Sequence, residues 1–242
     1  DRFRPYITNF NFKKKEKKIS AKLFNLGFPS ALQMFFEVGI FTAAIWLSGV
    51  LGKNPQAANQ IALNLASMTY MVALGVGVAA MIRVGNQRGM MNFIKLREVA
   101  LSTLLLIIIV DILFCFIFLI FNDYLPLLYL DPNNANNLTD VNEVIQIASK
   151  LLIIAGVFQL FDGIQAVVLG ALRGMQDVNI PAFIIFLSYG LIGFPTSYFL
   201  GFYTSLSVVG IWIGLMTGLF SSSLFLFLRF NYLSKKTIRL ND

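Results

Sequence analysis

The 242-residue sequence contains no histidine and a single cysteine, and only 13% of its residues are charged. Without histidine, the chain lacks the usual zinc ligand, the usual general base and the usual proton shuttle. Cys115 lies in an apolar run. Because it is the only cysteine, a disulfide within the chain and a cysteine metal site are both excluded. Any ionisable chemistry must therefore come from carboxylates, Lys, Arg or Tyr.

Apolar residues, in contrast, are abundant and make up 57% of the chain. Soluble domains are usually about 45–50% apolar and about 25% charged. A soluble core of this size cannot bury that much apolar surface, so lipid has to cover part of it. The composition therefore predicts an integral membrane protein.

Six apolar runs reach the length of about 20 residues that a membrane-spanning helix needs. They are residues 23–48, 58–82, 99–121, 144–171, 181–200 and 208–230, with predicted breaks at 52–55, 85–89 and 131–137. Barrel strands would alternate over about ten residues, so the predicted fold class is an all-α membrane protein with six transmembrane helices. Residues 1–22 are then a cytoplasmic loop, 23–230 the helical bundle and 231–242 a cytoplasmic tail.

Basic residues gather on one predicted side of the membrane, in both flanking segments and in the loops between alternate spans. They are Arg2, Arg4, Lys13, Lys14, Lys15, Lys17, Lys18, Lys22, Arg83, Arg88, Lys95, Arg97, Arg173, Arg229, Lys235, Lys236 and Arg239. The other side has Lys53, with Lys150 just inside the fourth span. Because Lys and Arg in short loops favour the cytoplasm, both ends are predicted to be cytoplasmic. The net charge of +7 then reflects topology, and no nucleic-acid partner is expected.

The chain starts at Asp1 rather than Met and lacks a signal-peptide core, so we interpret it as a piece of a longer protein. Small residues recur at spacings that favour close helix contacts in lipid. The stripes are Gly75, Gly77 and Ala79; Ala166, Gly170 and Gly174; and Gly210, Gly214 and Gly218. Ordinary tight packing explains them better than a sliding surface does.

Three acidic residues, Glu37, Asp111 and Asp162, lie inside predicted spans. A charge at the bilayer centre costs about 2.5–3.5 kcal/mol on insertion scales, so each needs a partner, a wet cavity or a proton. Such residues are functional candidates. Asp111 has no polar residue within one helical turn, and its role stays open between function and structure.

The other two acids have polar neighbours on their own helices. Gln33 lies one turn before Glu37 and can hydrogen-bond it, while Gln159 and Gln165 flank Asp162. A buried carboxyl group without a nearby cation can take a proton near neutral pH, or bind Na⁺ together with other oxygens. Asn64 and Ser67 share a helix face, and they either supply such oxygens or bond across helices as packing contacts.

Several segments, in order, resemble the MATE (multidrug and toxic compound extrusion) family, in particular its NorM-like branch. Residues 27–38, with Pro29 and Glu37, resemble the seventh helix of that family. The eighth helix is matched by 57–64 and 83–85, and the tenth by 159–165 and 170–174 followed by Asp177. Two positions depart from the family pattern, because Asn59 stands where His is common and Phe158 where relatives of this branch carry Tyr. Because Phe158 lacks the Tyr hydroxyl, one potential ligand for Na⁺ is absent, and this disfavours Na⁺ coupling.

The resemblance implies one lobe of a two-lobed, twelve-helix transporter in the bacterial inner membrane. This chain would be the C-terminal lobe, residues 1–22 the lobe-joining loop, and Glu37 and Asp162 the acidic pair of a cation site. The implied function is export of small-molecule drugs or toxins in exchange for H⁺ or Na⁺, with no cofactor besides that ion. The implied partners are the N-terminal lobe of the same protein and the bilayer.

Other functions remain as alternatives. A lipid-linked oligosaccharide flippase of a related two-lobed fold would need Arg or Lys inside the spans, and none is mid-span. A non-transporting membrane subunit would tolerate apolar replacement of the embedded acids. An ATP-driven pump is disfavoured by the lack of a Walker motif, and an enzyme by the lack of a nucleophile–base pair.

Overall fold

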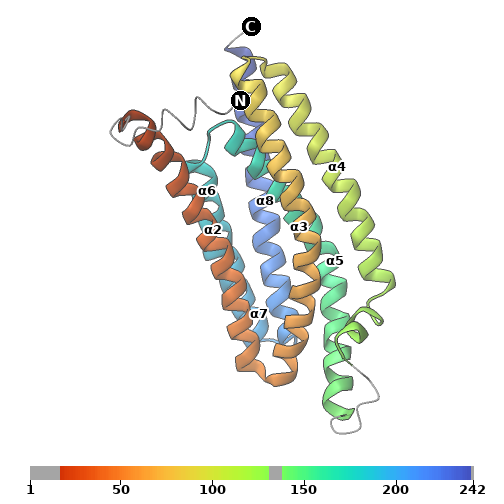
Figure 1. Cartoon of the computed structure of the whole chain (residues 1–242). Helices are drawn as coiled ribbons and strands as arrows, with labels where there is room; N and C mark the ends of the chain where they lie inside the picture. Colours follow the sequence, from red (N-terminus) through yellow and green to blue (C-terminus); the bar gives the residue numbers. More distant parts are fainter. Residues whose placement is uncertain (1–16, 131–137, 241–242) are drawn as a thin grey trace, which may run out of the picture.

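The structure, a computed structural model, describes residues 17–130 and 138–240 and is a bundle of long helices (Figure 1). Its elements are α2 Lys17–Leu51, α3 Lys53–Gly89, α4 Phe93–Ile120, the 3₁₀ turn η1 Leu125–Leu128, α5 Leu138–Gly174, α6 Asn179–Leu187, the π-helical η2 Ser188–Gly193, α7 Phe194–Phe202 and α8 Val208–Arg239. Since α6, η2 and α7 form one span, Asn179–Phe202, six helices within the described residues are long and apolar enough to cross a membrane. This confirms the predicted fold class.

The helices extend beyond the predicted spans. α2 begins at Lys17, within the segment 1–22 that was predicted as a loop, and α8 continues to Arg239, within the predicted tail. The break at 52–55 is confirmed in place, because Gly52 separates α2 from α3 with φ 132, a left-handed value that favours glycine. The predicted break at 131–137 and the basic residues of 1–16 lie outside the described residues.

The predicted break at 85–89 is wrong. α3 continues through Gly89, and the chain turns at residues 90–92, where Met91 has φ 58. Gly85 serves packing instead of a turn: a Cβ built on it would lie 3.7 Å from the carbonyl oxygen of Gly174 on α5. A glycine in a close helix contact and a glycine in a turn look alike in the sequence.

Basic side chains connect several helices at one end of the bundle. α2 begins and α8 ends at the same end, at the top of Figure 1. There Arg97 donates to the Ser234 hydroxyl at 2.6 Å, and Arg229 pairs with Asp177 at 2.8 Å. Basic side chains at this end thus tie α4 and the α5–α6 connection to α8.

α5 lies at the centre of the lobe and packs against α3, α4 and α8. Its contact with α3 is made backbone to backbone through small residues. A Cβ on Gly170 would collide with the carbonyl of Gly77, and one on Gly174 would lie 2.6 Å from the Met81 carbonyl oxygen. The glycine stripe on α8 does the same against α7, where the Ser197 hydroxyl donates to the Ile211 carbonyl at 3.0 Å. The stripes are therefore tight packing surfaces.

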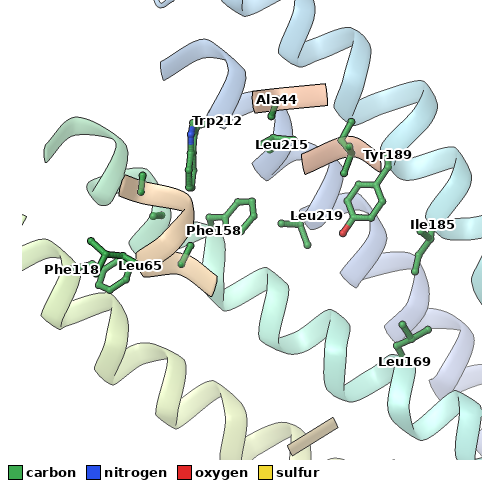
Figure 2. Close-up of a cluster of buried hydrophobic side chains, with 14 of the residues drawn as sticks. Ala44, Leu65, Phe118, Phe158, Leu169, Ile185, Tyr189, Trp212, Leu215 and Leu219 are labelled. Atoms are coloured by element: carbon green, nitrogen blue, oxygen red, sulfur yellow. The ribbon is translucent and has the colours of Figure 1, made fainter. Parts of the chain in front are cut away.

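The apolar core lies between α3, α5 and α8 (Figure 2). Phe158 and Trp212 meet there with ring centroids 5.5 Å apart, and Leu215 and Leu219 continue the cluster along α8. The Trp212 indole N–H donates to Asn59 Oδ1 at 2.8 Å, which satisfies its polar atom in the core. Phe158 thus packs within the apolar core, an environment that suits a ring without a hydroxyl group.

The fifth span loosens into a π-helix at η2, just before Pro195 in the first turn of α7. Proline has no N–H to donate to the preceding turn, and this is a recognised cause of local irregularity in a helix. The π-helical segment carries Tyr189, whose ring points into the core beside Leu219 (Figure 2). It therefore places a hydroxyl deep in the lobe.

Candidate functional site

A cavity of about 330 Å³ lies between α2, α3 and α5 and contains both predicted acids. Glu37 enters it from α2 and Asp162 from α5. The remaining lining residues are Met34, Val38, Phe41, Ile45, Gln60, Leu63, Asn64, Ala66, Ser67, Tyr70 and Phe158. The structure thus brings together Glu37, Asp162, Asn64 and Ser67, which lie on three helices. The rest of the wall is largely apolar.

One oxygen of Glu37 is held by two donors from other helices. Glu37 Oε1 accepts long hydrogen bonds from the Tyr70 hydroxyl and from Gln165 Nε2, both at 3.4 Å. Gln165 is itself fixed by the Tyr189 hydroxyl of η2, which lies 2.8 Å from Gln165 Nε2. A chain of polar contacts therefore links α2, α3, α5 and the π-helix around this carboxylate.

The predicted Gln33–Glu37 hydrogen bond is wrong. Gln33 Oε1 instead accepts from Arg173 Nη2 at 2.8 Å. A charged donor forms the stronger hydrogen bond, so the amide turns toward the guanidinium at the end of α5. Two residues one turn apart on a helix can face each other, but a partner from another helix decides their rotamers.

The structure also brings a cation toward Glu37, because the positive charge of Arg173 acts on the Glu37 carboxylate. The sequence placed Arg173 among the topology signals at the end of the fourth span. In the structure it is half-buried and reaches α2 through Gln33. Glu37 therefore has a counter-charge within the lobe. A cation bound in the cavity would interact with the Glu37 carboxylate alongside Arg173.

Asp162 has a more apolar environment. Its side chain is 7% exposed, and within residues 17–130 and 138–240 its Oδ1 has no hydrogen-bond partner. Gln159, one turn earlier, is 3% exposed, and neither of its amide atoms finds a partner among the described residues. Buried polar atoms normally have partners, so Asp162, which lines the cavity, and Gln159, which lies one turn away on α5, have unused capacity to bind a proton, a cation or water.

The predicted polar face of α5 is thus divided between two environments. Gln165 points to Glu37 and Tyr189, whereas one to two turns away the Gln159 amide and Asp162 Oδ1 have no hydrogen-bond partner among the residues that the structure describes. Asn64 is exposed, and its Oδ1 accepts from the Tyr129 hydroxyl at 2.9 Å. Ser67 donates to the backbone carbonyl of Asn64 at 2.7 Å.

Sequence reasoning missed three hydroxyl groups, those of Tyr70, Tyr129 and Tyr189. The contact between Tyr70 and Glu37 was not foreseen. The hydroxyl absent from Phe158 is replaced near the acids by those of Tyr70 and Tyr189. The readable signal was a tyrosine in an otherwise apolar span, because a buried phenol group usually finds a hydrogen-bond partner.

The polar groups that line the cavity are carboxylates, amides and hydroxyls. Within the part of the chain that the structure describes, no cluster of three or more His, Cys, Asp or Glu side chains suited to a metal ion is found. Two carboxylates together with an amide oxygen and a phenol suit a proton or a hard cation such as Na⁺ rather than a transition metal.

Asp111 lies outside this cavity. It is on α4, only 1% exposed, and it packs directly against Gly163 of α5. The structure therefore separates Asp111 from the other predicted site residues, although it adjoins the residue next to Asp162.

Comparison with known proteins agrees with this architecture. A model of the MatE family matches residues 29–199. A probable multidrug resistance protein NorM of Agrobacterium fabrum is 37% identical over 220 residues, which cover 90% of this chain and 46% of that protein. The multidrug resistance protein NorM of Aliivibrio fischeri is 32% identical and covers 96% of this chain and 49% of its own length. The chain spans about half the length of the curated relatives it matches.

Solved structures show the same fold. The eukaryotic MATE transporter AtDTX14 aligns with a TM-score of 0.80 at 22% identity, covering 94% of this chain and 50% of that one. A MATE structure in the bent conformation aligns with a TM-score of 0.82 at 16% identity, covering 97% and 49%. The resemblance to the MATE family is confirmed by the family model, and this chain, a multi-pass membrane protein, belongs to the MatE family.

Proposed function

We propose that this chain is one lobe of a multidrug efflux transporter, in which Glu37 and Asp162 exchange H⁺ or Na⁺ for an organic, often cationic, compound. The observation that carries the proposal is that both membrane-embedded acids line a single cavity. The relatives named as multidrug resistance proteins support the substrate class. No cofactor besides the coupling ion is proposed, and no covalent chemistry.

Competition for negative charge is the proposed mechanism of exchange. A coupling cation and a cationic substrate both gain from an ionised carboxylate in a low-dielectric wall, so occupancy by one disfavours the other. Asp162, with an unpaired oxygen among the described residues, is the simpler proton or Na⁺ acceptor. Glu37 retains Tyr70 and Gln165 as donors, and these stabilise it while it is ionised.

The cavity wall also suits the organic part of such a substrate. Phe41 and Phe158 provide ring surfaces, and Met34 a flexible apolar side chain. Aromatic faces attract organic cations, and methionine adapts to ligands of different shape. The combination of two acids with a soft apolar wall fits broad recognition of cationic compounds.

The half-length match to relatives supports a second lobe that would complete the transporter. In this proposal the cavity faces that lobe, and the end carrying Arg97 and Arg229 lies in the cytoplasm of the bacterial inner membrane. Cation occupancy then selects between two packings of the lobes, which expose the cavity to opposite sides.

The test is ethidium transport by the full-length two-lobe protein in vesicles, with Glu37→Gln and Asp162→Asn as near-isosteric variants. We expect each variant to lose coupled efflux by roughly tenfold or more, because the substitution removes the charge that would bind the cation, and a charge-assisted interaction is worth about 1.5–3 kcal/mol. Asp140→Asn, at the far end of α5, is the matched control: it removes only an exposed ion pair with Lys53, which contributes little, and should transport normally. If both site variants exchange ethidium at the wild-type rate, the assignment is wrong.

A further inference from the structure

The buried carboxyl group of Asp111 lies at the contact between α4 and α5, away from the cavity. A Cβ on Gly163 would collide with Asp111 Oδ2 and lie 2.9 Å from Ile107 Cγ1. Only a glycine at this position of α5 therefore leaves room for the carboxyl group. Across the residues with described positions, Oδ2 of Asp111 has no hydrogen-bond partner.

Burying an ionised carboxylate in apolar surroundings without a hydrogen-bond partner costs free energy. Asp111 is 1% exposed, and Ile107, one turn earlier, packs with Ala73 and Ala80 of α3 and Val167 of α5. A buried ionised carboxylate without a partner loses its hydration and gains nothing in return, so it is expected to bind a proton or to share its charge.

The charged and titratable neighbours of Asp111 come from several helices. From α5, Asp162 directly precedes Gly163, the residue against which Asp111 Oδ2 packs, and the Asp111 charge acts on the Asp162 carboxyl group. On α4, Cys115 follows one turn later. On α3, Tyr70 is bonded to Glu37 of α2, and the Glu37 charge in turn also acts on Asp162.

We propose that Asp111 is a second proton-binding carboxyl of this lobe, which shares one negative charge with Asp162 across the α4–α5 contact. When Asp162 releases its proton to the cavity, Asp111 keeps its own, and when Asp162 takes up a proton or a cation, Asp111 can ionise. Two carboxylates that interact in a low-dielectric interior titrate as a pair, so the pair and not Asp162 alone sets the pH at which the site binds cations. This deepens the proposed function, on which it rests.

The sign of the effect follows from like-charge repulsion. A neighbouring negative charge makes it harder to ionise Asp162, and a cationic substrate needs Asp162 ionised. Asp111→Asn keeps the shape of the side chain and removes its charge. Ethidium binding should therefore persist to lower pH in this variant than in the wild type.

The experiment is ethidium binding to the purified full-length protein by fluorescence polarisation between pH 5 and pH 9. We expect the pH of half-maximal binding to fall by about 0.5–1 unit in Asp111→Asn, a three- to tenfold change in proton affinity. Asp140→Asn is the matched control and should leave this pH unchanged. If Asp111→Asn does not fold, Asp111→Ser removes the same charge from a smaller side chain. An unchanged midpoint in the folded variant would show that Asp111 is only structural.

A second readout does not depend on the proposed function. Infrared difference spectra of the full-length protein, taken through a pH titration, follow the protonated carboxyl bands directly. If ethidium does not bind the wild type, the proposed substrate class is wrong. The charge-sharing inference then stands if Asp111→Asn shifts the titration of the Asp162 band, and falls if that titration is unchanged.

Discussion

The contact between α3 and α5 and the gap between α2 and α5 are built in opposite ways. Gly170 packs on the backbone of Gly77, with no side chain between the two helices. In contrast, α2 meets the rest of the lobe through side chains, as where Phe36 packs on Phe186 of α6 with ring centroids 4.9 Å apart. Most of the α2 surface is exposed, whereas α5 is largely buried.

The two acids therefore lie on helices that differ in how easily they can move. Asp162 lies on α5, whose backbone contacts leave no room to slide, because packed interiors respond poorly to small displacements. Glu37 lies on α2, which can shift by side-chain rearrangement. We therefore expect the movement that accompanies cation exchange to occur mainly in α2.

The largest effect on this comparison should come from Gly170→Ala. The new methyl group meets the Gly77 carbonyl, and overpacking of this kind costs about 1–3 kcal/mol. Thermal unfolding of the full-length protein in detergent should shift down clearly. Gly75→Ala is the control, since a Cβ there meets no atom within 4 Å in the described part of the molecule. Equal shifts in both variants would contradict a tight α3–α5 contact.

A smaller effect is expected from Tyr70→Phe, which removes a donor to Glu37 without changing the ring. Since the hydrogen bond is long, the loss should be roughly 1 kcal/mol, or about fivefold weaker ethidium binding by fluorescence polarisation. Tyr203→Phe, on an exposed tyrosine at the end of α7, should bind as the wild type does. Undiminished binding by Tyr70→Phe would show that the α3 hydroxyl does not support Glu37.

The smallest effect should come from Phe36→Leu, which loosens α2 from α6. Aromatic pairing contributes about 0.5–1 kcal/mol beyond buried area, so unfolding should shift only slightly. Hydrogen exchange followed by mass spectrometry should nevertheless rise in α2 and stay constant in α5 if α2 is the adaptable helix. Trp46→Leu, at an exposed aromatic residue of the same helix, serves as the control. Faster exchange in α5 as well would remove the distinction between the two supports.

The spans were predictable because each depends on a local property, the length of an apolar run. The turn after α3 was not, because Gly85 reads as a breaker until its contact with Gly174 is seen. The π-helical η2 is also invisible in the sequence, although Pro195 marks where the fifth span is weakened.

At the site, the cost of burying charge picked out Glu37 and Asp162, and both line the cavity. Their partners could not be predicted, because they come from other helices. Gln33 is hydrogen-bonded to Arg173 instead of Glu37, and Gln165 is hydrogen-bonded to the Tyr189 hydroxyl of η2. Spacing along one helix shows which residues are able to meet, whereas the packing of the helices decides which of them do.

The most direct measurement is ethidium efflux by the full-length protein in vesicles under separately imposed pH and sodium gradients. We predict that at least one gradient drives wild-type efflux, that dissipating it stops transport, and that Asp162→Asn no longer responds to it. Efflux that ignores both gradients, or that still follows the same gradient in Asp162→Asn, would contradict cation exchange at these acids.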